Sequence, residues 1–302
     1  MDNEGKKEIK HLVISGGGIT GFSFYGALKE SSILGKWNID AIESIYGTSV
    51  GSILAVILAL KYDWKTTDDY FIKRPWQNIY KFNLYSMIGA IQQRGIFTKQ
   101  IIDEMLTPLF LAKDIPLTVT MEEFYQITKI DIHIFVTEIH SFLLLNISHT
   151  THPTMKLLDA VYASSAVPIL FAPLFDNSNN HCYCDGGMKA NYAIKQCIED
   201  GKDPSEIMGV VRVQDDKNDP TFTEDSTLID YAFVIMRKGI EVIIKSPNDQ
   251  VLHTEYNISS TPLSVGNIIQ AASSMEERIR LIEMGEQYVR EFYSENMVNE
   301  SS

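Results

Sequence analysis

Ser49 is the residue whose sequence context most clearly predicts chemistry. It is the central residue of Gly47-Thr48-Ser49-Val50-Gly51, a G-x-S-x-G pattern. In this pattern the serine lies on a sharp turn between a strand and a helix, where a side chain at either glycine would collide with the neighbouring elements. The turn also directs the hydroxyl toward the N-terminus of the helix, where unpaired N–H groups favour a developing negative charge. The pattern therefore predicts a nucleophilic serine.

A second glycine-rich turn, GGGITG at residues 16–21, precedes this serine. Consecutive glycines suit an oxyanion hole, because its N–H groups must approach a tetrahedral oxygen with no side chain between. The spacing Gly16-x-Gly18-x-x-Gly21 also fits the dinucleotide-binding fingerprint, and Asp40 lies about where its acidic ribose ligand falls. That ligand should end the second strand, whereas Asp40 precedes it. An oxyanion loop is favoured, and dinucleotide binding stays an alternative.

Asp185 is the predicted partner of the serine. It begins Asp185-Gly186-Gly187 at the end of an apolar segment. Most such aspartates bond to local backbone, but a serine nucleophile needs a base within hydrogen-bond reach. An aspartate in water has a pKa near ~3.9 and is a poor base toward an alcohol, so burial must raise it. The alternative is a Ser49, Asp185 and His253 triad in the chain order of an α/β-hydrolase, although His253 lies in a polar stretch without glycine or strand-end context.

The hydrophobic pattern predicts an α/β fold. Short apolar segments alternate with segments of helical periodicity, which implies three layers, with a mainly parallel central sheet flanked by helices. The predicted strands are 11–15, 42–46, 130–138, 142–147, 182–184 and 207–213. The predicted helices are 22–33, 50–60, 98–106, 121–127, 155–165, 228–244 and 265–292.

Length and charge limit the class of protein. The chain has 302 residues without an internal repeat or linker, so we expect one domain over 1–302, with its motifs in about 10–213 and a mainly helical part in 214–302. A formal net charge of −13 argues against nucleic acid as a partner, because nucleic-acid binding needs clusters of Lys and Arg.

The termini and cysteines bear on the compartment. The first ten residues are polar, and the longest apolar run, residues 50–60, is far shorter than the roughly 20 residues of a membrane span. We therefore expect a cytoplasmic protein without a signal peptide or membrane span. Cys182, Cys184 and Cys197 are an odd number, which favours reduced thiols. The first two have the spacing of alternate strand residues, so no metal site is expected.

Four motifs in this order resemble those of the patatin-like phospholipases, over about residues 10–213. They are the glycine loop, the G-x-S-x-G turn, the block Ala163-Ser164-Ser165-Ala166-Val167-Pro168, and Asp185-Gly186-Gly187. The resemblance implies a patatin-like α/β fold with a Ser-Asp dyad. It makes Ser49 the nucleophile and Asp185 the base. The implied oxyanion donors are Gly16, Gly17 and Gly18. The remaining glycines of the motifs, which shape the turns around these residues, are Gly21, Gly47, Gly51, Gly186 and Gly187.

The function implied by the resemblance is a lipid acyl hydrolase of the phospholipase A type. It would cleave glycerolipid esters through an acyl-enzyme, with no cofactor, in transient contact with a membrane surface. The expected lipid contact is formed by apolar loops around Phe82 to Ile96 or by the aromatic-rich stretch 62–94, which contains Trp76 and Phe82; plain helix packing is the alternative for this stretch. Two departures stand out: Thr20 replaces the family's usual Arg or Lys, and Asn191 lacks the proline that usually follows two residues later. The first keeps open a catalytically idle patatin fold that serves as an interaction module.

Overall fold

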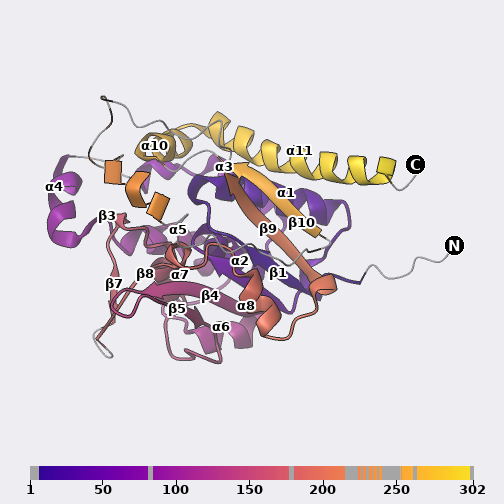
Figure 1. Cartoon of the computed structure of the whole chain (residues 1–302), viewed down its shortest axis with the longest axis horizontal. Coiled ribbons are helices and arrows are strands. Elements are labelled where there is room, and N and C mark those ends of the chain that lie inside the picture. The colour runs from indigo at the N-terminus through magenta and orange to yellow at the C-terminus, as the bar shows by residue number, and fades with distance from the viewer. Residues whose placement is uncertain are drawn as a thin grey trace.

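A computed structural model of the chain has one large mixed sheet with helices on both faces (Figure 1). It describes residues 7–80, 84–176, 180–214, 252, 254–260 and 264–299, and scattered positions between 224 and 239. The described strands of the large sheet follow the order β10-β9-β1-β2-β4-β8-β7, and β5 pairs with β4. These strands are β1 (His11–Ile14), β2 (Ser44–Thr48), β4 (Asp131–Glu138), β5 (Leu143–Ile147), β7 (Leu174–Asp176), β8 (His181–Asp185), β9 (Ile207–Gln214) and β10 (Thr254–Ser260).

The centre of the sheet is parallel, as predicted. β10, β9, β1, β2 and β4 are parallel neighbours, whereas β5, β7 and β8 are added antiparallel. Every residue of β1 and β2 is buried. Continuous burial is typical of parallel strands, because crossover helices cover both faces of the sheet.

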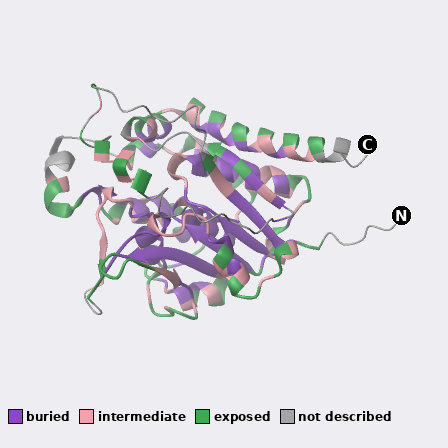
Figure 2. Cartoon of the chain, in the orientation of Figure 1, coloured by how far each residue is buried: buried purple, intermediate pink, exposed green. Residues whose placement is uncertain are grey.

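Alternate residues of the central strands divide the core into two layers. Leu12 and Ile14 pack in the large cluster with α1 (Gly21–Ile33) and α2 (Val50–Ala59). Val13 and Tyr46 point to the other face, where α8 (Ile194–Glu199) covers them. Figure 2 shows the sheet as the buried layer of the molecule. The predicted three-layer α/β class is therefore confirmed.

The C-terminal helices differ from the prediction. Residues 265–292 were expected to form one helix, but the structure has α10 (Val265–Ser273) and α11 (Met275–Asn299). Ser274 between them has extended backbone, and its hydroxyl accepts the Glu277 N–H at 3.0 Å. A serine three residues before a glutamate is a helix-start signal, so a local cap overrides the continuous apolar pattern. α11 packs along α1, where Gly26 and Gly285 leave room for the partner backbone.

Most other predicted helices are present with shifted ends: α5 (Gln100–Leu111), α6 (Met121–Thr128) and α7 (Leu157–Ser165). β10 was not predicted, because it follows a polar stretch, and predicted helix 228–244 lies largely outside the described residues. A small parallel sheet pairs β3 (Gly95–Phe97) with β6 (Ile169–Phe171). None of the described helices is long and apolar enough to cross a membrane.

The aromatic stretch 62–94 contributes to the core. It contains α3 (Trp64–Lys73) and α4 (Leu84–Gln93). Phe71 and Trp76 are buried and pack edge-on against Phe22 of α1. Trp76 is only 4% exposed, which corrects the expectation that its side chain contacts lipid. Phe82 lies outside the described residues.

Candidate active site

The register of β4 brings the two predicted catalytic residues together. Thr48, the last residue of β2, pairs with Phe135, and Asp185, the last residue of β8, pairs with Val136. β5 takes up the opposite edge of β4, so β2 and β8 follow one another along the same edge. Neighbouring residues of one strand therefore place the end of β2, and Ser49 after it, beside Asp185.

Ser49 lies on a strained turn between β2 and α2. Its φ is 54°, in the left-handed region that non-glycine residues rarely adopt. A Cβ at Gly47 would lie 2.6 Å from the Gly51 carbonyl oxygen, and a Cβ at Gly51 would collide with the Ile14 carbonyl. Both glycines are thus required by close backbone packing. The turn leaves Ser49 7% exposed, directly before the N-terminus of α2.

Ser164 anchors this strained turn from α7. The Ser49 N–H donates to Ser164 Oγ at 2.9 Å, and Ser164 Oγ donates to the Phe135 carbonyl at 2.6 Å. One hydroxyl thus ties the nucleophile's backbone to β4. Ser164 belongs to the third of the four motifs, and no role was predicted for it from the sequence. The signal that pointed to it was its place in that motif.

Asp185 is buried, and no Lys, Arg or His in the described part of the chain forms a salt bridge with it. Its Oδ1 accepts the Gly187 N–H at 2.7 Å, whereas Oδ2 has no hydrogen-bond partner among the described residues. Burial raises the pKa of Asp185 to about 6, although the Ser49 hydroxyl and the Gly187 N–H act in the opposite direction. Ser49 is therefore near the carboxyl, but no hydrogen bond of ordinary geometry to Oδ2 is formed. Catalytic hydrogen bonds often tighten only once substrate is bound.

The glycine loop lies against the nucleophile. A Cβ on Gly16 would be 3.1 Å from the Ser49 Cβ. Gly18 has a φ of 54°, which a glycine adopts without strain. Among the described residues, no acceptor takes the N–H of Gly17 or of Gly18. These two donors are therefore available to a bound oxygen atom.

Asn191 holds the loop in place. The Gly16 N–H donates to the Asn191 carbonyl at 2.9 Å, and Asn191 Nδ2 donates to the Gly16 carbonyl at 3.0 Å. Its side-chain oxygen would also meet a Cβ at Gly187, in the turn after Asp185. Asn191 thus joins the loop to the aspartate turn. In the sequence, Asn191 was notable only for the missing proline two residues after it.

Thr20 is the position where the glycine loop departs from the family pattern. Its side chain is 2% exposed, and its hydroxyl has no partner among the described residues. The residue therefore fills space under the loop and does not reach toward solvent.

Other predicted or alternative ligands lie elsewhere. Asp40 precedes β2 in a short turn of 3-10 helix and pairs with Lys61 at 2.9 Å, so it is not at the strand end that a ribose ligand requires. His253 falls outside the described residues. Cys182, Cys184 and Cys197 are free and buried, the first two on alternate positions of β8. Within the described part of the chain, no group of His, Cys, Asp and Glu could hold a metal ion.

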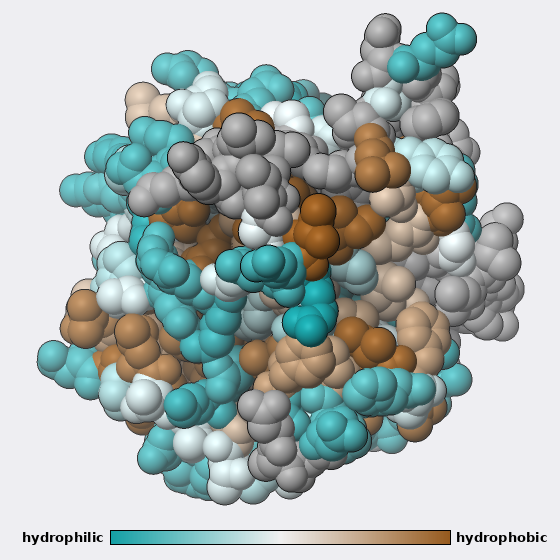
Figure 3. Space-filling model, turned by 90° about the vertical axis from the view of Figure 1, so that its left-hand side faces the viewer, coloured by the Kyte–Doolittle hydropathy of each residue, from teal (hydrophilic) through white to brown (hydrophobic). Residues whose placement is uncertain are grey.

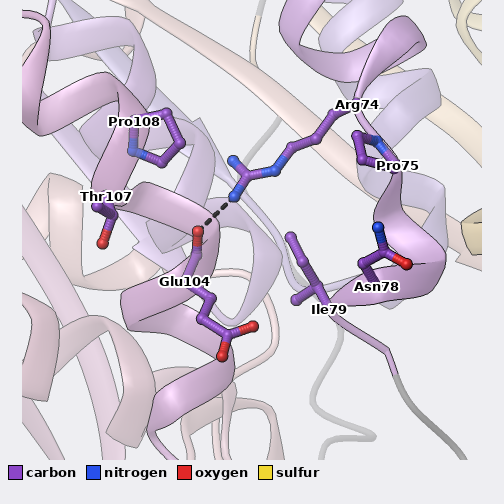
Figure 4. Close-up of a pocket in the computed structure, with 7 residues that line it drawn as sticks. All are labelled: Arg74, Pro75, Asn78, Ile79, Glu104, Thr107 and Pro108. Atoms are coloured by element: carbon purple, nitrogen blue, oxygen red, sulfur yellow. Dashed lines mark hydrogen bonds between the residues drawn. The ribbon is translucent and has the colours of Figure 1, made fainter.

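A surface pocket of about 450 Å³ opens between the end of α3 and α5 (Figure 4). The Arg74 guanidinium crosses it and donates to the carbonyls of Glu104 and Met105. Its charge is therefore used within the protein. None of the predicted site residues lines this pocket; its lining is Arg74, Pro75, Asn78, Ile79, Glu104, Thr107 and Pro108.

Comparison with known families connects this geometry to a reaction class. The sequence model of a family described as "Patatin-like phospholipase" matches residues 12–198. This span includes the glycine loop, Ser49, Ser164, Asp185 and Asn191. It covers more than half of the 302 residues.

Two curated viral proteins are each 28% identical to part of this chain. "Probable lipid hydrolase 463L" of Invertebrate iridescent virus 6 is 28% identical over 196 residues, 64% of this chain and 64% of that protein. "Uncharacterized protein R571" of Acanthamoeba polyphaga mimivirus is 28% identical over 190 residues, 63% and 61% of the two chains. The chain thus spans less than two thirds of these curated relatives. Of solved structures, VipD from Legionella pneumophila has a TM-score of 0.48 at 17% identity, over 92% of this chain and 67% of VipD.

Proposed function

The chain belongs to the patatin-like phospholipase family, and on that premise we propose that it is a lipid acyl hydrolase of the phospholipase A type that uses a Ser49-Asp185 dyad. The observation that carries the proposal is the buried Asp185 carboxyl, whose pKa is raised to about 6 next to the Ser49 hydroxyl. The name of the viral relative, a probable lipid hydrolase, supports a lipid ester as the substrate class.

The pKa of Asp185 explains how a dyad can work without histidine. A general base is most effective when its pKa lies near the working pH. Burial supplies this shift at Asp185 because Oδ2 has no partner among the described residues and no cation lowers its pKa. The carboxylate thus becomes a stronger base than an aspartate in water.

The first half-reaction transfers the acyl group to the enzyme. Asp185 takes the Ser49 hydroxyl proton while Ser49 Oγ attacks the ester carbonyl carbon. The carbonyl oxygen becomes an oxyanion, which the free N–H groups of Gly17 and Gly18 stabilise. Gly16 supports them from the same loop, because Asn191 engages its N–H and carbonyl. When the intermediate collapses, the ester C–O bond breaks and Asp185 returns the proton to the leaving alcohol.

The second half-reaction uses the same groups with water. Asp185 takes a proton from a water molecule, whose oxygen attacks the acyl carbon, and the same N–H groups stabilise the second oxyanion. The bond between the acyl carbon and Ser49 Oγ then breaks, Ser49 Oγ recovers a proton from Asp185, and a fatty acid is released. The tether of Ser49 N–H to Ser164 keeps the nucleophile's backbone fixed through both steps.

The test is Ser49→Ala, assayed on phospholipid vesicles and on p-nitrophenyl esters. We expect activity toward both substrates to fall by at least about 10³-fold, because the acyl acceptor is lost. Ser44→Ala is the matched control, since Ser44 is a buried serine of the same strand that bonds to His11 at 2.8 Å. Hydrolysis by Ser49→Ala at the rate of the unaltered chain would refute the proposal, whereas absence of hydrolysis by the unaltered chain would favour the interaction-module alternative.

A further inference from the structure

The β4–β5 hairpin extends beyond the candidate active site on the same side of the sheet. Asp185 is opposite Val136, and two residues later Glu138 pairs with Leu143 to close the hairpin. Strand residues rise by roughly 3.3 Å each, so the tip beginning at Ile139 lies about 10 Å beyond the level of Asp185. A substrate approaching the active site from this side must pass the hairpin.

Large apolar side chains are exposed at this tip and on the neighbouring strand β7. Ile139 is 39% exposed, Phe142 37%, Leu143 58% and Phe175 49%. Phe175 pairs with Cys182 of β8, and the Ile139 N–H donates to the Cys182 carbonyl at 2.7 Å, so Ile139 and Phe175 lie in one row across the strands. Phe142 and Leu143 lie at the start of the returning strand of the hairpin, where Leu143 pairs with Glu138. We call Ile139, Phe142, Leu143 and Phe175 the apolar rim. Figure 3 shows the side of the molecule that carries β7 and α4, with apolar side chains gathered in patches among polar ones.

Cations stand at both ends of the apolar rim. Lys189 Nζ is 5.2 Å from the Phe142 ring centre, and the Arg94 guanidinium is 5.2 Å from the Phe175 ring centre. In the described part of the chain, neither cation forms a salt bridge. Because the chain carries a net charge of −13, two unpaired cations beside exposed aromatic rings are a local departure from its acidic surface.

The acidic residue next to the tip of the hairpin, Glu138, is buried. The Glu138 side chain is 3% exposed, and its carboxylate accepts the backbone N–H and the hydroxyl of Ser141, both at 2.6 Å. These bonds fix the hairpin turn. Phe142 follows with a φ of 53°, a conformation that disfavours bulky residues, yet an aromatic side chain occupies this exposed position. Asp176 faces His181 in the β7–β8 pairing.

We propose that the apolar rim, with Arg94 and Lys189, is the surface by which this protein docks on a phospholipid bilayer. The inference rests on the proposed lipid acyl hydrolysis. Apolar side chains flanked by cations match the bilayer interface, where rings enter the acyl boundary and cations remain at the headgroups. Docking by the hairpin would bring the carboxyl end of the sheet, with Ser49 and Asp185, to the membrane surface.

The test measures binding separately from hydrolysis. In a Ser49→Ala background, flotation with phosphatidylcholine vesicles is compared before and after Phe142→Ser combined with Leu143→Ser. We expect the vesicle partition coefficient to fall at least about tenfold, because two apolar side chains no longer enter the bilayer. Ile127→Ser is the control: Ile127 is 53% exposed, but on α6, which leads to the opposite end of β4. Thermal melting of each variant establishes that it is folded.

A second part of the experiment tests the contribution of the cations Arg94 and Lys189. Adding phosphatidylserine to the vesicles should increase binding, and Arg94→Ala should remove part of that increase. Absence of vesicle binding by the parent chain, or equal losses in the rim variant and Ile127→Ser, would overturn docking by the rim. Docking by the rim would also be overturned if the rim variant still bound vesicles but no longer self-associated. The apolar rim would then be a contact surface between two copies of this chain. Hydrolysis of p-nitrophenyl esters by the unaltered chain is measured in parallel and tests the proposed function alone.

Discussion

Two aspartates at opposite ends of the sheet have opposite surroundings. Asp131 begins β4, where its carboxylate oxygens lie 2.8 Å from His149 Nδ1 and 3.1 Å from His133 Nε2. Asp185 ends β8 at the carboxyl end of the parallel strands, where one oxygen accepts the Gly187 N–H and the other has no partner among the described residues. One carboxylate is held by two imidazoles and the other by a single backbone donor.

The pKa values follow from this difference. Burial alone raises the pKa of Asp131, but hydrogen bonds and charge from His133 and His149 outweigh it, so the pKa lies below its ordinary value. At Asp185 burial dominates and raises the pKa to about 6. An unpaired carboxyl is costly to bury and is suited to proton transfer, whereas a paired one stabilises the fold.

Exchanging each aspartate for asparagine should separate activity from stability, and this is the largest expected effect. Asp185→Asn should lower kcat by at least about 10³-fold, because the amide cannot take the Ser49 proton. The same change removes a buried charge. Since the pKa of Asp185 rises from 3.8 to about 6, the variant should be more stable at neutral pH by up to about 3 kcal/mol.

Asp131→Asn should behave in the opposite way. It removes a carboxylate that bonds to His149 and lies 3.1 Å from His133 Nε2, so we expect a loss of about 1–3 kcal/mol of unfolding free energy with ester hydrolysis retained. Urea unfolding and p-nitrophenyl ester assays on both variants measure the two quantities. If Asp185→Asn kept its activity, or if both variants lost stability alike, the distinction between the two aspartates would fail.

Ser164→Ala tests whether hydrolysis also depends on the position in which Ser164 holds the Ser49 backbone. Loss of the bond to the Ser49 N–H should relax the turn with φ 54° and lower kcat about 10- to 100-fold, with little change in KM. Ser165→Ala is a matched control, because the Ser165 hydroxyl has no partner among the described residues. An equal fall in both variants would indicate a general disturbance of α7.

The two aspartates should also give opposite pH dependences. Hydrolysis should decline below about pH 6 as Asp185 takes up a proton, by about tenfold per unit well below that value. Because its folded pKa is raised, Asp185 destabilises the fold fully above about pH 6, and this cost is lost as the pH falls from about 6 to the ordinary value of 3.8. The pKa of Asp131 is lowered, so its contribution to stability is present above the unfolded value and is lost as the pH falls through the folded value. If the decline of hydrolysis at acid pH is centred near pH 6 and persists in Asp131→Asn, it supports Asp185 as the base. If Asp131→Asn removes this decline, the role of Asp185 is contradicted.

Thr20→Val should have the smallest effect. The buried Thr20 hydroxyl has no partner among the described residues, so replacing it by a methyl group should raise the unfolding free energy by up to about 1 kcal/mol. Chemical denaturation measures this change. A clear loss of stability would indicate that the hydroxyl is bonded and that this position supports the glycine loop.

The sequence predicted those parts of the site that local geometry dictates. Gly47 is required by backbone contact with the helix that directly follows it, and Gly51 by contact with the Ile14 carbonyl of β1; the two glycines frame Ser49 within five residues and so disclosed it in the sequence. The partnership with Asp185 needed the resemblance, because no local pattern shows that β2 and β8 share one edge of β4. Ser164 and Asn191 were not assigned roles, since each acts through a hydrogen bond to a residue more than one hundred positions away.

In the fold, too, the sequence predicted elements with a local pattern and missed those that depend on distant residues. Helix and strand periodicities predicted the parallel core, and predicted helix 121–127 is present as α6, which begins at a capping box of Thr120 and Glu123. The prediction missed β10, which is held by its register with β9 and follows polar residues. It also placed Trp76 at the surface, because an aromatic-rich segment looks alike in sequence whether it faces the core or a lipid.

The central claim, that Asp185 activates Ser49, is tested most directly by labelling with a fluorophosphonate. The rate of covalent modification is followed by mass spectrometry between acid and neutral pH in the unaltered chain and in Asp185→Asn. We expect modification at Ser49, a rate that falls below about pH 6, and almost no modification in Asp185→Asn. Modification at another residue, or modification of Asp185→Asn at the rate of the unaltered chain, would contradict it.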